Sequence, residues 1–201
     1  MDRLLKTTWV LAAASLLVAS CGDEELPVYV QGSWQVRCPS GLPGCRDGDP
    51  HQLNGYADEL MDGQSVSCDV GSAGDGKKSL TLLLRDGGDS LQLRRVVFDP
   101  DSGTVDRCQV FVDDGDNEYE ARSENGDCGS GPPAPDGQRC QLQVRRGEDA
   151  GDGLGATLDV TLRCLSIVGP ANPERLQRNV LAIRGSTEDP AFLRLANCPG
   201  F

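Results

Sequence analysis

Hydrophobic and polar side chains alternate along most of the chain beyond residue 27. In the segment 28–38, Val30, Trp34 and Val36 share one parity, and polar residues such as Gln31 fall between them. A period of two is typical of a β-strand with one buried face, whereas helical periodicity is nearly absent. The alternation recurs at 65–70, 80–84, 91–93, 108–112, 140–144, 157–164 and 181–183, and a last strand is expected at 192–197.

Turn-forming residues separate these segments. Runs of Asp, Gly, Asn and Pro occupy 86–89, 99–103, 113–117 and 151–153. Short strands joined by such turns predict an all-β fold, either an antiparallel β-sandwich or a barrel-like one. The alternation slips at Arg94-Arg95, which predicts a bulge or a strand break there. Two further segments, 56–61 and 173–178, are candidates for short helices that leave the fold class unchanged.

The Pro-rich stretch 129–138 is the best candidate for an internal linker, and a two-domain chain would divide there. We favour one β-rich domain over residues 28–201, because the strands on both sides are short and neither half closes a core alone.

The first residues follow the order of a secretory signal. Arg3 and Lys6 form a basic head, an apolar run extends from Trp9 to Val18, and small residues follow. The run is too short to cross a bilayer, which takes about 20 apolar residues. We therefore expect residues 1–20 to be a signal peptide.

The sequence Val18-Ala19-Ser20-Cys21 resembles the bacterial lipobox. The resemblance implies cleavage before Cys21 and a diacylglycerol on its thiol, followed by a short acidic tether over 21–27. It also favours the outer membrane, because Gly22 stands where aspartate is associated with inner-membrane retention, although Asp23 follows. Whether the domain then faces the periplasm or the cell surface stays open. The alternative is an ordinary signal peptide with Cys21 as a first free thiol.

Nine cysteines are an odd number, and an exported chain with an odd cysteine needs an explanation. Lipidation of Cys21 leaves an even set for disulfides in an oxidising compartment. The remaining eight are Cys38, Cys45, Cys68, Cys108, Cys128, Cys140, Cys164 and Cys198. Local pairing predicts Cys38–Cys45 and Cys128–Cys140, which would leave Cys68–Cys108 and Cys164–Cys198.

The second half loosely resembles small cysteine-rich lipoproteins of the bacterial envelope that have no established activity. The likeness lies in a strand-turn-strand at 110–120, a Gly-rich turn leading into the strand 153–164 that ends in Cys164, and a final Cys198-Pro199. It implies an envelope location and no particular reaction.

The formal charge of −12 limits the partners. Asp2, Arg3 and Lys6 make the first 20 residues slightly positive, so the chain beyond them carries about −13. Such a chain is not expected to bind nucleic acid, whose phosphates require basic patches. Anionic lipid would repel it as well, so membrane attachment must come from the acyl chains on Cys21.

No motif for catalysis or cofactor binding is present. The single histidine, His51, lies in a turn-like Asp-Gly-Asp-Pro-His segment that we expect to be exposed, and no Gly-x-Ser-x-Gly elbow occurs. Cysteines needed for disulfides cannot serve as nucleophiles or zinc ligands, and no Cys-x-x-Cys pair exists. We therefore predict a protein that is not an enzyme, with no catalytic residues, no cofactor and no catalytic metal.

Acidic residues cluster in three loops, at 99–106, 113–118 and 148–152. None has the EF-hand spacing, and β-turns need Asp and Gly in any case, so structural calcium is an alternative to ordinary turns. Glycoside hydrolysis by a pair of loop carboxylates is a second alternative, because the separation of such a pair is set in three dimensions.

These observations lead to one main hypothesis. The chain is expected to be a non-enzymatic outer-membrane lipoprotein whose disulfide-tied β-domain binds another envelope component, protein or glycan. Few aromatic residues are available beyond the core for a sugar-binding platform. The main alternative is an envelope glycan hydrolase using loop carboxylates, and an inhibitor module is a third.

Overall fold

The computed structural model describes residues 26–37, 48–115, 118–134, 137–147, 154, 156–168, 180–184 and 190–201, with the backbone alone at 166, 168 and 180–184. The predicted signal peptide, the lipidation site Cys21 and the predicted pair Cys38–Cys45 lie outside the described residues, as does the candidate helix 173–178.

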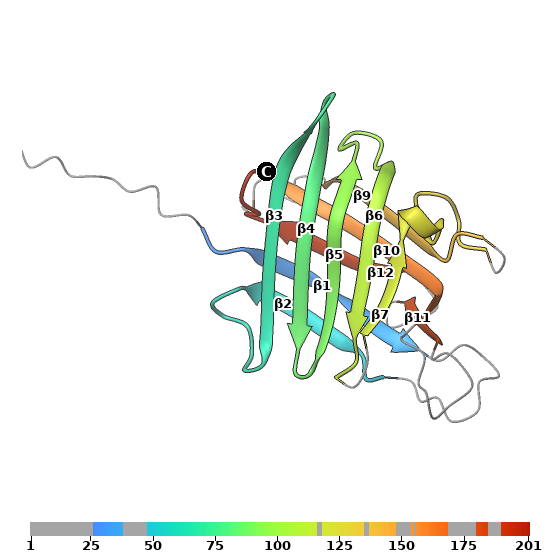
Figure 1. Cartoon of the computed structure of the whole chain (residues 1–201). Coiled ribbons are helices and arrows are strands. Elements are labelled where there is room, and N and C mark those ends of the chain that lie inside the picture. The colour runs from blue at the N-terminus through green and yellow to red at the C-terminus, as the bar shows by residue number, and fades with distance from the viewer. Residues whose placement is uncertain are drawn as a thin grey trace, which may run out of the picture.

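The described strands form a β-sandwich, which confirms the predicted all-β class (Figure 1). One layer is an antiparallel meander of β3 (Gln64–Gly74), β4 (Lys77–Asp86), β5 (Asp89–Phe98), β6 (Val105–Asp113) and β7 (Glu118–Arg122). The other layer contains β1 (Tyr29–Arg37), β2 (His51–Tyr56), β9 (Cys140–Gly147), β10 (Thr157–Val168), β11 (Val180–Arg184) and β12 (Ala191–Ala196). Strands of the two layers cross at a steep angle in Figure 1.

The strand order of the second layer is β2-β1-β12-β10-β9, and β11 shares the gap between β1 and β10 with β12. One residue pair, Val168 with Glu120, joins β10 to β7 and links the layers at one side. A two-residue strand, β8 (Cys128–Gly129), runs parallel to β9 and follows the short 3-10 turn η1 (Ser123–Asn125).

The alternation read from the sequence becomes the core between the layers. Trp34 of β1, Leu82 of β4, Val110 of β6 and Val160 of β10 are at most 1% exposed. Burial of these apolar side chains supplies the main favourable free energy, at about 25 cal/mol per Å² of apolar surface removed from water. The predicted irregularity is confirmed as well, because the β5–β6 register shifts after Arg94 and Arg95 has a φ of 50°.

The seam between the edge strands β2 and β3 is closed without a strand pairing. At one end the Val70 N–H of β3 donates to the Pro199 carbonyl over 2.8 Å. Gly200 follows with a φ of +81°, and a Cβ on it would lie 1.8 Å from the Val70 carbonyl oxygen. At the other end the side-chain amide of Gln64 donates to the backbone carbonyl of Gln52 over 3.1 Å. These contacts cover an edge that would otherwise offer unpaired backbone groups.

Three disulfides are present among the described residues, with a pairing that differs from the prediction. The bonds are Cys68–Cys198, Cys108–Cys128 and Cys140–Cys164, so the predicted Cys128–Cys140, Cys68–Cys108 and Cys164–Cys198 are wrong. All six side chains are at most 6% exposed, and those of Cys68, Cys108, Cys140 and Cys164 share the parity of the buried apolar residues in their own strands. Parity shows which face of a strand is buried. It does not show which strands are neighbours, and the neighbouring strands determine which cysteines pair.

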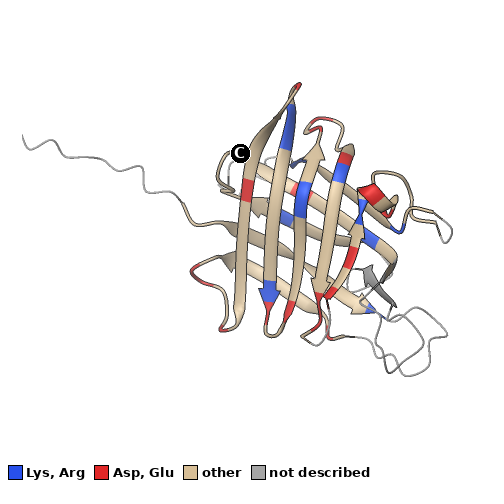
Figure 2. Ribbon diagram, viewed as in Figure 1, with Lys and Arg blue, Asp and Glu red and all other residues tan. Residues whose placement is uncertain are grey.

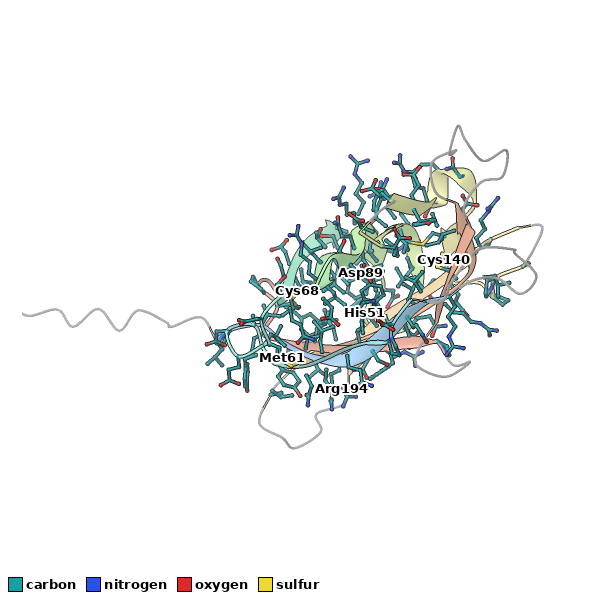
Figure 3. The ribbon with its side chains drawn as sticks, turned by 90° about the horizontal axis from the view of Figure 1, so that it is seen from below. His51, Met61, Cys68, Asp89, Cys140 and Arg194 are labelled. Carbon is teal, nitrogen blue, oxygen red and sulfur yellow. A yellow bond between two sulfur atoms is a disulfide. The ribbon has the colours of Figure 1, made fainter. Side chains whose placement is uncertain are left out.

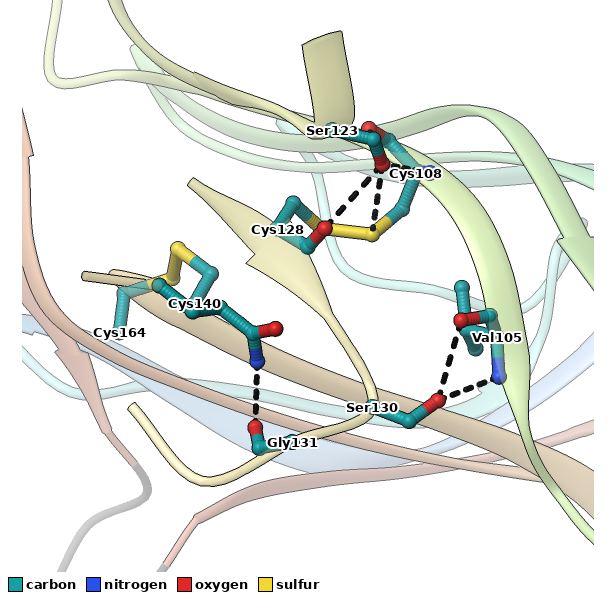
Figure 4. Close-up of a disulfide and its surroundings, with 9 residues drawn as sticks. Val105, Cys108, Ser123, Cys128, Ser130, Gly131, Cys140 and Cys164 are labelled. Carbon is teal, nitrogen blue, oxygen red and sulfur yellow. Dashed lines mark hydrogen bonds between the residues drawn. A yellow bond between two sulfur atoms is a disulfide. The ribbon is translucent and has the colours of Figure 1, made fainter. Parts of the chain in front are cut away.

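The Cys108–Cys128 bond is surrounded by hydrogen bonds from one serine (Figure 4). The Ser123 hydroxyl accepts from the Cys108 N–H at 2.7 Å, and the carbonyls of Cys108 and Cys128 both lie 3.1 Å from it. The hydroxyl has one proton, so it donates to one of these carbonyls at a time. Ser123 therefore ties β6 to the irregular segment that contains β8. The predicted linker at 129–138 begins in this segment, directly after the disulfide.

Candidate functional site

His51 is the first candidate, and its position corrects the sequence interpretation. It is 5% exposed and begins strand β2, whereas the surrounding Asp, Gly and Pro residues predicted an exposed turn. Its ring stacks on Trp34, the opposite residue of β1, with centroids 4.0 Å apart. The strand begins immediately after Pro50, and His51 shares its parity with the buried Leu53. That parity was the signal that could have indicated an inward side chain.

Two carboxylates from the opposite layer face the two nitrogens of this ring. His51 Nδ1 lies 3.1 Å from Asp86 Oδ2, and Nε2 lies 3.1 Å from Asp89 Oδ2. Only the first contact has hydrogen-bond geometry. The two acids flank the turn between β4 and β5, and Gln64 of β3 also donates to Asp86 over 3.2 Å. Figure 3 shows His51 between the layers with Asp89 beside it.

The carboxyl of Asp89 is the perturbed group of this cluster. Burial raises its pKa above the ordinary value of 3.8, the charge of His51 opposes that rise, and Asp114 and Asp113 add to it. A neutral imidazole has one N–H and one lone pair, so it cannot donate to both acids.

This arrangement ties the two layers together and offers little to a reaction. A general base needs a nitrogen directed at a nucleophile, and both nitrogens of His51 face carboxylates. The cluster links β2 of one layer to the β4–β5 turn of the other, at the end of the seam opposite Cys68–Cys198. Its clearest physical role is to hold that end closed.

The loops considered for calcium make internal hydrogen bonds where they are described. The Asp99 carboxylate accepts from the N–H groups of Ser102 and Asp101, and these bonds hold its pKa below the ordinary value. Asp113 accepts from the Gly115 N–H over 2.9 Å. Within the described ranges, no group of three or more His, Cys, Asp or Glu side chains is arranged to hold a metal ion. The cluster at 148–152 lies outside these ranges.

The outer face of the second layer is the other candidate site, and sequence reasoning missed it. Four polar side chains lie in register across β2, β1, β12 and β10, in the order Asn54, Gln31, Arg194 and Asp159. Arg194 pairs with Asp159 through two hydrogen bonds of 2.8 and 2.9 Å. Figure 3 shows Arg194 on the side of its layer that faces away from His51.

Aromatic side chains flank this polar row on both sides. Tyr29 and Tyr56 pair across β1 and β2, with ring centroids 5.3 Å apart and edge-to-face, and the Tyr29 hydroxyl donates to Asn54 over 3.0 Å. On the other side Phe192 of β12 is 41% exposed, with the Arg194 guanidinium 5.9 Å from its ring. The sequence predicted few aromatics outside the core. The signal missed was the polar-face parity of Tyr29 within β1.

Comparison with protein-family models, curated proteins and solved structures found no match for this chain. Among the described residues, no helix is long and apolar enough to span a membrane.

Proposed function

We propose that this protein is a non-enzymatic lipoprotein, anchored in the outer membrane through acyl chains on Cys21, that binds a glycan of the cell envelope. The basic head, the apolar run and the lipobox-like Val18-Ala19-Ser20-Cys21 support the anchor. The outer face of β2, β1, β12 and β10 supports the binding function. The observation that carries it is the exposed Phe192 beside a row of amide, guanidinium and carboxylate groups.

A glycan fits the chemistry of this face. Aromatic rings contact the C–H faces of sugars, while amides and ion-paired groups exchange hydrogen bonds with hydroxyls. Asn54 and Gln31 are exposed, and Arg194 is already neutralised by Asp159, so the row suits an uncharged, hydroxyl-rich chain. Strands hold the row in place, and little conformational entropy would be lost on binding.

Titration of the detergent-solubilised lipidated protein with envelope polysaccharide, followed by calorimetry, tests the binding face. Phe192→Ala and Asn54→Ala should each weaken binding about tenfold, the effect of losing one stacked ring or one well-placed hydrogen bond. Ser67→Ala changes an exposed position on β3 of the opposite layer and should leave the affinity unchanged. Absence of glycan binding, or equal losses in all three variants, would contradict the proposal. Specific capture of an envelope protein without glycan binding would point to a protein partner.

The anchor has its own test. Cys21→Ser should abolish acylation, prevent cleavage before residue 21 and leave an unprocessed precursor. Normal processing and unchanged membrane association of this variant would contradict lipidation.

Glycan hydrolysis is the second candidate, and one observation favours it. Asp89 has a raised pKa and lies near other carboxyls, as expected of a general acid in a glycosidase. Incubation of polysaccharide with the wild type, Asp89→Asn and Asp86→Asn distinguishes glycan hydrolysis from glycan binding alone. Release of reducing ends by the wild type, lost in both variants, would replace the binding proposal with an enzymatic one.

A further inference from the structure

Two arginines converge on one phenyl ring on the outer face of the meander layer. Arg94 of β5 and Arg122 of β7 lie on either side of Gln109 of β6, in one row across the sheet. Their guanidinium carbons are 4.8 and 5.6 Å from the ring centroid of Phe111, two residues further along β6. Phe111 has the outward parity of Gln109, yet it is 6% exposed and lies outside the core cluster. The arginines therefore help to cover an outward-facing ring.

The charges of this cluster do not balance. Arg122 is ion-paired with Glu120, whereas Arg94 is hydrogen-bonded to the neutral amide of Gln92. One positive charge is thus left over among these groups. The Nε of Arg122 is buried and has no hydrogen-bond partner among the described residues. Two guanidiniums drawn to one ring repel each other, and a bound anion would relieve that repulsion.

Further arginines extend the basic character of this surface. Arg95, at the bulge that follows Arg94, and Arg107 of β6 are both exposed. Figure 2 shows this as blue on β5 and β6, although red also lies at the upper end of β6, on β7 and in the turns at the lower end of the layer. A local positive surface on a chain with a formal charge of −12 attracts anions despite the overall repulsion.

We propose that Arg94 and Arg122 form a binding site for a phosphate group carried by an envelope component. Arginine suits this ligand because its planar guanidinium donates two parallel hydrogen bonds to phosphate oxygens, and the aromatic ring below fixes its orientation. The amide of Gln92 beside Arg94 adds a polar group to the rim. The site lies on the layer opposite the proposed glycan face, so phosphate binding and glycan binding can each fail without the other, and only the envelope source of the phosphate rests on the proposed location.

Calorimetry on the detergent-solubilised full-length lipidated protein, at constant ionic strength in chloride, tests the site. Inorganic phosphate is the first probe, and saturable millimolar binding is expected. Glucose 6-phosphate and a water-soluble short-chain phosphatidylglycerol form two further arms. Tighter binding of either one identifies a sugar phosphate or a lipid headgroup as the source, and equal binding assigns recognition to the phosphate group alone. Each of these outcomes supports the site, whereas no saturable binding of any probe overturns it.

The variants separate a specific site from general attraction. Arg94→Gln should weaken phosphate binding about tenfold, and Arg94→Lys should recover only part of the loss, because a lysine cannot replace the two-pronged contact. Arg85→Gln is the matched control, since it removes one charge from an exposed position on β4 of the same layer. Unchanged affinity in Arg85→Gln supports the site. Equal weakening by Arg85→Gln and Arg94→Gln shows long-range attraction only and overturns it.

Discussion

Cys68 in β3 is bonded to Cys198, which follows β12 and lies 130 residues later in the chain. The bond joins an edge strand of one layer to the end of the other, next to the hydrogen bond between Val70 and Pro199. It therefore closes one end of the seam between β2 and β3, where the described strands make no pairing. The His51 cluster lies at the other end. A disulfide therefore holds one end of the seam closed, and the contacts of His51 with two carboxylates hold the other.

Removing this disulfide should cost more stability than removing a short-range one. Cross-linking across 130 residues restricts the unfolded chain by about 5 kcal/mol, against about 3 kcal/mol for the 24-residue separation of Cys140–Cys164. Urea denaturation of Cys68→Ala/Cys198→Ala and of Cys140→Ala/Cys164→Ala measures both losses. The first variant should also become sensitive to carboxypeptidase, because its C-terminal tail is held only by hydrogen bonds. An equal or smaller loss than in the second variant would contradict this role for the seam.

The Asp89 carboxyl gives the fold a specific dependence on pH. Its pKa is raised in the folded chain, so the fold binds this proton more tightly than the unfolded chain does. The resulting stabilisation is complete below the ordinary carboxyl pKa of about 4 and is lost as pH rises through the raised value. Asp89→Asn cannot ionise. Its stability relative to the wild type should therefore increase as pH rises above about 4.

Urea midpoints between pH 3 and 8 measure this difference. Asp58→Asn changes the charge by the same amount at an exposed loop position and serves as the control. The test is whether the stability difference between Asp89→Asn and the wild type rises or falls with pH. A wild type that gains stability over Asp89→Asn with rising pH would mean that the contact with His51 outweighs burial and the neighbouring Asp113 and Asp114.

The fold class could be predicted from sequence because period-two alternation depends on local chemistry. The bulge at Arg94-Arg95 was visible for the same reason, since one extra residue shifts every later side chain to the other face. The disulfide pairing was not predictable, because it depends on which strands become neighbours. Cys198 meets Cys68 only after the two layers have packed together.

The candidate sites were not predictable from the sequence for a related reason. The partners of His51, Asp86 and Asp89, come more than 30 residues later in the chain and belong to the other layer. The local sequence shows only the turn-like residues before His51, and these predicted an exposed position. The segment 56–61, expected as a short helix, instead contains the end of β2 at Tyr56 and a turn over 57–59 that leads toward β3. Register likewise aligns Gln31, Arg194 and Asp159 from three distant segments, which no single stretch of sequence reveals.

Ser123 should be a stability determinant despite lying on a short irregular segment. Ser123→Ala leaves the Cys108 N–H without its acceptor and removes a donor from two nearby carbonyls. Loss of such part-buried hydrogen bonds costs about 1–3 kcal/mol. Urea denaturation provides the measurement, with the exposed Ser67→Ala on β3 as a control that should change stability by less than about 0.5 kcal/mol. Equal stability of both variants would show that the disulfide holds this region without the serine.

Gly32 in β1 marks the closest approach of two strands beneath the proposed glycan face. A Cβ at this position would lie 2.2 Å from the Phe192 carbonyl oxygen and 2.8 Å from the Leu193 Cα, and backbone atoms cannot yield as a flexible side chain does. Gly32→Ala should therefore separate β1 from β12 and destabilise the fold by about 1–3 kcal/mol. It should also weaken glycan binding, because Gln31 and Arg194 would lose their register. Gly88→Ala, whose nearest atom is 4.0 Å away, is the control, and similar melting temperatures for the two variants would contradict the close approach.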